Sequence, residues 1–130
     1  MNTRQPLGRI LVVDDEVQVN ELLRDFLSGL GYIVKNAVSG REALRLAEIF
    51  QPDVVVLDIL MPSMNGGEVL DRLRADHPST RIIMLSANQD PGVARSTLVR
   101  GAFDYLPKPI DFSVLERVVS AALCAGQRAR

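Results

Sequence analysis

The chain is organised around residues 52–62, which read PDVVVLDILMP. The four apolar residues 54–57, three of them β-branched, predict a short strand that is buried on both faces. The strand stops at Asp58, and Pro62 with the Asn-Gly-Gly sequence at 65–67 predicts a loop after it. Asp58 is therefore expected at the carboxyl end of a central strand, on the edge of an open α/β sheet where ligands bind.

Four further short apolar runs alternate with helical patterns along the chain. They are residues 10–13, 32–34, 82–85 and 103–106. Apolar residues recur at helical spacing after each run, and polar side chains are placed to cap four of the helices, namely Ser39, Asn65, Asp90 and Asp111. Five strands that each precede a helix predict one parallel sheet with helices on both faces.

The composition bounds the class of protein. The chain has 130 residues, of which 47% are hydrophobic and 24% are charged, and this predicts one domain with its own core. A net charge of -1 argues against direct binding of nucleic acid by this domain. Residues 1–9 lack the apolar core of a signal peptide, and no apolar run approaches the length of a membrane span. We expect a cytoplasmic protein that does not contact a membrane.

Cys124 and His77 are each the single residue of their kind. One cysteine excludes an internal disulfide and fits a reducing cytosol, and its place in an apolar run predicts a small buried residue. His77 precedes a proline at a helix end and is expected to be exposed. We expect an N-terminal arm over residues 1–8, the domain itself over 9–124, and a frayed tail or the start of a linker over 125–130.

Polar functional groups follow four of the predicted strands. They are Asp14 with Asp15, then Asp58, Ser86 and Lys108. Each has an ordinary alternative, because Asp15 can cap the next helix and the others can be solvated loop or turn residues. If the strands take the order 2-1-3-4-5, which is common among doubly wound sheets, all of these groups meet at one edge near the switch point between strands 1 and 3. Local structure alone does not explain that joint placement.

The chemistry of this set suits phosphoryl transfer. Three clustered carboxylates repel one another unless a cation neutralises them, and Mg²⁺ is a hard cation that accepts a few carboxylate ligands. A carboxylate beside Mg²⁺ can attack a phosphoryl group and form an acyl phosphate. Ser86 can donate a hydrogen bond to a phosphoryl oxygen, and Lys108 can place a positive charge beside another.

The motifs resemble the receiver domain of bacterial two-component response regulators. They are, in chain order, Asp-Asp at 14–15, Asp-Ile-Leu-Met-Pro at 58–62, Gly66, Ser-Ala at 86–87 and Lys-Pro at 108–109. The resemblance covers residues 8–124, with every motif position filled. It implies a flavodoxin-like (βα)5 fold, with a five-stranded parallel sheet of order 2-1-3-4-5, and a phosphorylation-dependent signalling role.

The resemblance also implies a role for each residue of the acidic edge. Asp58 is the expected phosphoacceptor. Asp15, Asp58 and the backbone carbonyl of Leu60 are expected to bind Mg²⁺, while Asp14 acts on the metal through water. A domain of this kind assists its own phosphorylation and dephosphorylation but is not an enzyme with external substrates.

Further implied roles lie on the last two strands. Ser86 and Lys108 are expected to contact the phosphoryl group, Ser86 and Tyr105 to act as the switch, and Pro109 to follow a cis peptide bond. The expected donor is a sensor histidine kinase or a phosphotransfer protein. A homodimer through the fourth helix, fifth strand and fifth helix is a further expectation, and the output domain or partner is not specified by these residues.

Two other functions remain open on the sequence. One is a Mg²⁺-dependent phosphatase or phosphotransferase with an aspartyl nucleophile. Such enzymes usually carry a second acid two residues after the nucleophile, where this chain has Leu60. The other is a degenerate receiver that only docks partners, against which the filled acidic pocket argues.

Overall fold

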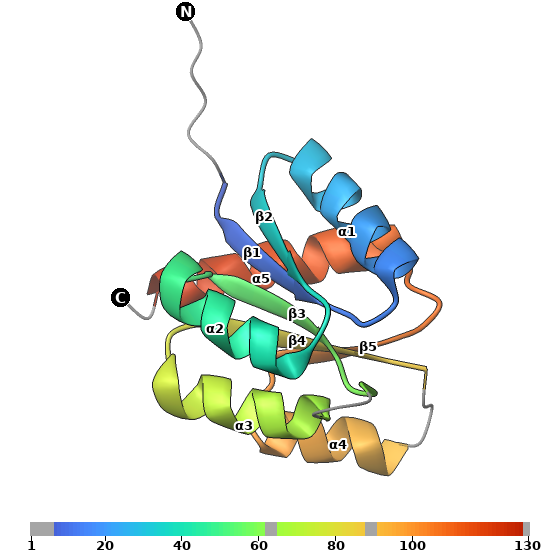
Figure 1. Cartoon of the computed structure of the whole chain (residues 1–130), viewed down its shortest axis with the longest axis vertical. Helices are drawn as coiled ribbons and strands as arrows, with labels where there is room; N and C mark the ends of the chain where they lie inside the picture. The colour runs from blue at the N-terminus through green and yellow to red at the C-terminus, as the bar shows by residue number, and fades with distance from the viewer. Residues whose placement is uncertain (1–6, 62–64, 88–90, 129–130) are drawn as a thin grey trace, which may run out of the picture.

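The computed structural model describes residues 7–61, 65–87 and 91–128. Over these residues, strands and helices alternate without exception along the chain (Figure 1). The elements are β1 (Arg9–Val13), α1 (Val17–Gly29), β2 (Ile33–Ala37), α2 (Gly40–Phe50), β3 (Val54–Asp58), α3 (Gly66–Asp76), β4 (Arg81–Ser86), α4 (Pro91–Val99), β5 (Asp104–Pro107) and α5 (Phe112–Arg128). Pro62 and Asp90, for which a loop and a helix cap are predicted, lie outside the described residues.

The strands form one parallel sheet in the order β2-β1-β3-β4-β5. In its register, Val13 at the end of β1 lies beside Ala37 of β2 and Leu57 of β3, and Asp58 lies beside Leu85 of β4. The predicted flavodoxin-like fold is confirmed. The carboxyl ends of β1 and β3 are adjacent, so the switch point lies where the acidic residues were expected.

Two hydrophobic layers cover the sheet. Helices α1 and α5 pack on one face, and α2, α3 and α4 lie along the other (Figure 1). Within β3, Val54 and Val56 point into the α1–α5 layer, while Val55 and Leu57 point into the opposite layer. All four side chains are fully buried. A strand covered on both faces needs apolar residues at every position, which explains the continuous run in the sequence.

Three of the predicted helix caps are present. The side chains of Ser39, Asn65 and Asp111 accept hydrogen bonds from backbone N–H groups in the first turns of α2, α3 and α5. Helix α1 differs, because its N-cap position is occupied by Glu16, whose side chain makes no capping bond. The alternative reading of Asp15 as a helix cap is therefore wrong.

Two expectations about surface position were wrong. Cys124 is exposed, because the apolar run in which it lies spans more than the inward face of α5. The His77 side chain is only 11% exposed, and its Nε2 lies 3.4 Å from Oε1 of Glu48 on α2. Both errors concern which way a side chain faces on a helix or at its end, which depends on tertiary packing.

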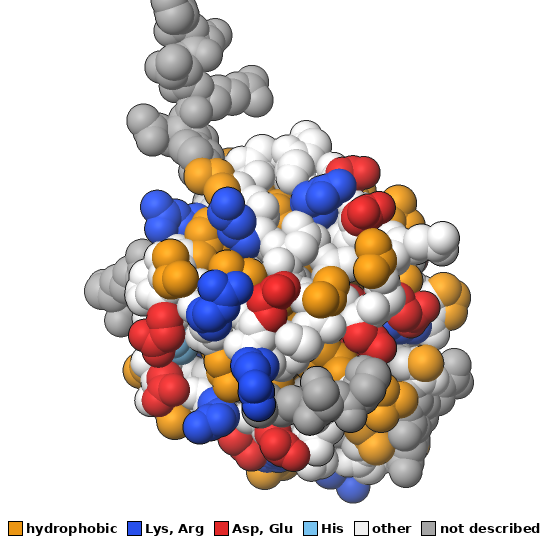
Figure 2. Space-filling view, viewed as in Figure 1, with side chains coloured by type: hydrophobic (Ala, Val, Ile, Leu, Met, Phe, Trp, Pro, Cys, Tyr) orange, Lys and Arg blue, Asp and Glu red, His pale blue; other side chains and the backbone are white. Residues whose placement is uncertain are grey.

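The end of α5 also differs from the prediction. The helix continues through Gly126 to Arg128, whereas a frayed tail was expected from residue 126. The guanidinium of Arg81, at the start of β4, donates a hydrogen bond to the carbonyl of Ala125 at 3.3 Å and so ties this last part of the helix to the sheet. None of the described helices is long and apolar enough to cross a membrane. On the face shown in Figure 2, acidic and basic side chains are interspersed.

Candidate functional site

Asp58 ends β3 as a buried carboxylate, with a fractional exposure of 3%. Its Oδ1 accepts a hydrogen bond from the backbone N–H of Leu60 at 3.3 Å. The chain later returns to this point, where the N–H of Gly66 donates to the carbonyl of Ile59 at 2.7 Å. A Cβ on Gly66 would lie 2.5 Å from the carbonyl oxygen of Asp58, so this close approach requires glycine.

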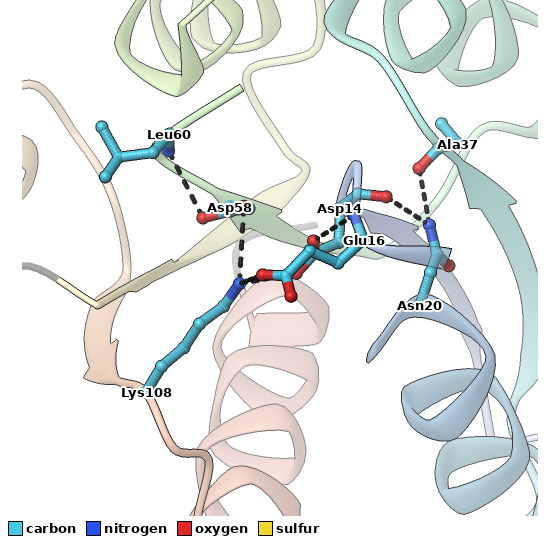
Figure 3. Close-up of polar contacts among 7 residues, drawn as sticks. All are labelled: Asp14, Glu16, Asn20, Ala37, Asp58, Leu60 and Lys108. Carbon is cyan, nitrogen blue, oxygen red and sulfur yellow. Dashed lines mark hydrogen bonds and ion pairs between the residues drawn. The ribbon is translucent and has the colours of Figure 1, made fainter. Parts of the chain in front are cut away.

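Lys108 follows β5 and extends its amine toward three carboxylates (Figure 3). Its Nζ lies 2.9 Å from Oδ2 of Asp14, 3.4 Å from Oδ2 of Asp58 and 3.5 Å from Oε1 of Glu16. The Lys108 side chain is 15% exposed and that of Asp14 is fully buried. Lys108 is therefore part of a buried charge cluster and is not the solvated turn lysine of the alternative reading.

The pKa values of this cluster follow from its burial and its charges. Burial, and after it the charge of Asp14, raise the pKa of Asp58 to about 6 against the opposing effects of Lys108 and the Leu60 N–H. For Lys108, burial favours the neutral amine. The hydrogen bond to Asp14 and the charges of Asp58, Asp14 and Glu16 outweigh that effect and raise its pKa above the ordinary value. The site therefore gathers several acidic side chains around the single amine of Lys108.

The carboxylates can together hold a hard divalent cation. Asp14, Asp15 and Asp58 each offer an oxygen, and these three atoms lie within 4.8 Å of one another. Asp14 and Asp58 are buried, whereas Asp15 is partly exposed at the side of the cluster that faces solvent. Mg²⁺ favours such a site because it binds oxygen and keeps several of its waters. The residues present fit the predicted metal.

The remaining predicted residues lie on β4, on β5 and directly after β5. Ser86 ends β4, is fully buried, and accepts at its carbonyl a hydrogen bond from the N–H of Lys108 at 2.8 Å. Tyr105 lies beside Met84 in the β4–β5 register and packs, half-buried, against the core layer of α2 and α3. The Lys108–Pro109 peptide bond is cis, as the resemblance implies.

Sequence reasoning missed two residues of the site. Glu16 gave no signal, because a carboxylate near the start of a helix is ordinary. Asn20 is buried in α1, and its side chain donates a hydrogen bond to the carbonyl of Asp14 at 2.9 Å. A signal for it existed, since Asn20 recurs with Leu23 and Leu27 at spacings of three and four and so lies on the buried face of the helix.

Comparison with known families gives a direct match. The family model of the response regulator receiver domain matches residues 10–120. The chain belongs to this family. Receiver domains bind Mg²⁺ at an acidic cluster and are signalling domains, and in this receiver domain the cluster is Asp14, Asp15 and Asp58.

Curated relatives of this receiver domain are longer response regulators. The chain is 48% identical over 101 residues to the response regulator MprA of Mycolicibacterium vanbaalenii, a match that covers 78% of this chain and 44% of that protein. It is 38% identical over 117 residues to the regulatory protein AtoC of Escherichia coli, covering 90% of this chain and 25% of that protein. The receiver domain thus spans less than half the length of these relatives.

Solved structures agree with the fold. NtrX from Brucella abortus superposes with a TM-score of 0.90 at 32% identity, covering 95% of this chain and 28% of that one. A response regulator receiver domain protein from Clostridium thermocellum also gives a TM-score of 0.90, at 29% identity, covering 95% of this chain and 99% of that one.

Proposed function

We propose that this receiver domain is a cytoplasmic switch that accepts a phosphoryl group on Asp58 from a sensor histidine kinase or a phosphotransfer protein. One observation supports it most strongly. The buried carboxylate of Asp58 lies within a cluster of acids and 3.4 Å from the Lys108 amine. A nucleophile, a metal site and a phosphoryl-binding cation thus share one edge of the sheet.

In the proposed reaction, one oxygen of Asp58 attacks the phosphorus of a phosphohistidine. The new O–P bond forms as the P–N bond breaks, and the electron pair of that bond stays on the imidazole nitrogen. With a pKa of about 6, Asp58 is largely ionised at neutral pH and more basic than an ordinary aspartate, which favours attack. Lys108 neutralises a phosphoryl oxygen, and the Ser86 hydroxyl donates a hydrogen bond to another.

The metal would be held by Asp15, Asp58 and the backbone carbonyl of Leu60, with Asp14 acting through water. When bound, Mg²⁺ would offset the mutual repulsion of the carboxylates and the phosphoryl oxygens. The full burial of Asp14 and its hydrogen bonds from Glu16 and Lys108 support the indirect role of Asp14, because both of its carboxylate oxygens already have protein partners.

Phosphorylation would change the surface formed by α4, β5 and α5. A charge-assisted hydrogen bond draws Ser86 toward the phosphoryl group, and the space that it leaves lets Tyr105 turn inward. Phosphorylation shifts this equilibrium only by its different contacts with the two states. The changed surface, which includes Arg95, Asp104 and Arg117, would then bind a second copy or another partner. Direct binding of nucleic acid by this domain is not part of the proposal.

Two rival functions make different predictions. An aspartyl phosphatase would need a second acid at the position of Leu60, whose side chain is apolar and 60% exposed. A docking-only receiver would not take up phosphate at all. Phosphoryl incorporation measured beside turnover of a phosphate ester separates the three functions.

The direct experiment is labelling by acetyl phosphate, read as the intact mass. We expect the wild type to gain one phosphoryl group with Mg²⁺ and none with a chelator, and Asp58→Ala to gain none. Asp25→Ala, at a carboxylate that is 72% exposed, is the matched control and should label as wild type. A label that survives in Asp58→Ala would show that Asp58 is not the acceptor.

A further inference from the structure

The side chain of Asn20 is a buried amide with a partner for every polar atom. Asn20 is only 2% exposed, on the face of α1 that packs against the sheet. Its Nδ2 donates to the carbonyl of Asp14 at 2.9 Å and to the carbonyl of Ala37 at 2.7 Å. Its Oδ1 accepts a hydrogen bond from Nδ2 of Asn36. The orientation of the amide is unambiguous, because a flip would turn its oxygen toward two carbonyls.

The two carbonyls lie where the functional edge of the sheet begins. Ala37 ends β2, and Asp14 comes directly after β1. The same Ala37 carbonyl also accepts the N–H of Asp14 at 3.1 Å. Asn20 therefore joins α1 to the ends of two neighbouring strands at the point where the chain leaves the sheet toward the acidic cluster (Figure 3).

The bonds to Asn20 complete a full set of partners for Asp14. The Asp14 N–H is bound by Ala37, and its carbonyl by Asn20. Its Oδ1 accepts from the N–H of Glu16 at 2.9 Å, and its Oδ2 accepts from Lys108 at 2.9 Å. Among these contacts, the one from Asn20 reaches the Asp14 carbonyl, and it fixes the peptide plane between Asp14 and Asp15.

We propose that Asn20 is a positioning residue for the divalent cation of this site. It does not touch the metal. Its amide fixes the peptide that links Asp14 to Asp15, and with it the spacing of the carboxylates that bind the cation. In so far as the cation serves phosphorylation of Asp58, this inference rests on the proposed function.

Removal of the amide has a defined consequence. In Asn20→Leu the side chain keeps about the same size but leaves the carbonyl of Asp14 buried without this hydrogen bond. A buried carbonyl that loses its partner turns toward another donor or toward water. Either movement rotates the peptide before Asp15 and changes where its carboxylate points. Substitution of residues that support metal ligands in this way typically weakens metal binding by about 10- to 100-fold.

The test is calorimetric titration of Mg²⁺ into the unphosphorylated protein. We expect Asn20→Leu to weaken binding by about tenfold or more, and Asn20→Ser, which keeps a short donor, to weaken it less. The matched control is Thr80→Val. Thr80 is also buried and donates one side-chain hydrogen bond to a backbone carbonyl, that of Pro52 at 2.9 Å, but at the opposite edge of the sheet.

Thr80→Val should lower the melting temperature and leave Mg²⁺ affinity unchanged. The amide resonance of Glu16, which reports the turn directly, should move in metal-free Asn20→Leu and stay in place in Thr80→Val. Wild-type affinity in Asn20→Leu, or an equal loss in the two variants, would overturn the proposal. If Asn20→Leu does not fold, Asn20→Ser decides, because wild-type affinity in that variant overturns it equally.

Acetyl phosphate labelling separates this proposal from the proposed function. Without a label on the wild type at any Mg²⁺ concentration, the proposed function fails while the titration still decides the role of Asn20. Where the wild type labels, we expect Asn20→Leu to need about tenfold more Mg²⁺ for half-maximal labelling and to approach the wild-type rate at saturation.

Discussion

Helices α1 and α4 both follow a strand at the functional edge of the sheet, but they are attached to it very differently. Helix α1 buries Asn20, Leu23 and Leu27 against the sheet. Among the described residues of α4, Thr97 is buried, and its hydroxyl donates to the carbonyl of Ala94 within the same helix. The side of the molecule that carries Asp14 is thus fixed by core packing and buried hydrogen bonds.

The C-terminal end of α4 is held by contacts that are partly exposed to solvent. Beyond this end, Arg100 donates two hydrogen bonds to Asp71 of α3, at 3.1 and 2.7 Å, and one to the carbonyl of Gly67 at 2.7 Å. The side chains of this pair are 37% and 56% exposed. Elements with few buried contacts open and shift most easily, so the proposed response to phosphorylation would be expressed most readily through α4.

The largest expected effect comes from removing the positive charge of Lys108, which lies beside Asp14. Lys108→Ala leaves buried carboxylates without their ammonium partner, and we expect a loss of about 3 to 5 kcal/mol in the free energy of unfolding without divalent metal. Added Mg²⁺ should restore part of that loss. Urea unfolding with and without Mg²⁺ measures both effects, with Lys35→Ala, at an exposed lysine, as control. We also expect Lys108→Ala to label partially, while its response to phosphorylation is blunted. A fully stable Lys108→Ala would contradict this account of the charge cluster.

The next largest effect concerns Asp58 and pH. Its pKa is about 6 in the folded protein and 3.8 in an ordinary environment, so between these values the folded state binds a proton that the unfolded chain releases. Stability should therefore fall as pH rises through this window, by up to about 3 kcal/mol in metal-free protein. Asp58→Asn should lack this decline and be more stable than wild type above about pH 6. Unfolding curves of both proteins across the window, without divalent metal, measure it. Parallel pH profiles would refute the assignment.

A smaller effect is expected on the loosely attached side. Arg100→Gln removes a partly exposed ion pair and should cost less than about 1 kcal/mol. It should nevertheless speed hydrogen exchange in α4 while leaving α1 unchanged. Arg24→Gln, which breaks the exposed pair with Asp25 on α1, is the control. If α4 exchanges at the wild-type rate in Arg100→Gln, the helix is held by other contacts.

The smallest expected change is spectroscopic and links the two sides. With Mg²⁺ and beryllofluoride as a phosphoryl mimic, the side-chain NMR signals of Tyr105 should shift in wild type and shift less in Ser86→Ala. Ser28→Ala, at an exposed serine on α1, should respond as wild type. Identical responses in wild type and Ser86→Ala would exclude the route through Ser86.

The fold could be predicted because its signals are local and repeated. The run at 54–57 is apolar at every position since β3 is covered on both faces, and Ser39, Asn65 and Asp111 cap helices as their spacing indicates. The edge that carries Asp58 follows from the ends of the strands. Its sheet order came from resemblance and not from the residues.

What escaped prediction depends on how elements pack together. The polarity of Asn20 does not reveal that its partners are the carbonyls of Asp14 and Ala37, which lie on two different strand ends. The rotation of α5 decides that Cys124 faces solvent, and the approach of α2 decides that His77 is largely covered. Periodicity in the sequence identifies which face of a helix is buried, but it does not identify the atoms of other elements that contact that face.

The guanidinium of Arg100 occupies the space that a side chain at position 67 would need. A Cβ at position 67 would lie 2.7 Å from Nη1 of Arg100, at the movable end of a long side chain, whereas the Cβ of a residue at 66 would strike the fixed backbone of Asp58. The two adjacent glycines therefore differ in how readily each can be replaced by a residue with a side chain. Position 66 accepts no side chain while the backbone of Asp58 and Ile59 keeps its place. The Cβ of an alanine at 67 would first meet the guanidinium of Arg100, so a variant of this chain without Arg100 would have more room for a side chain there.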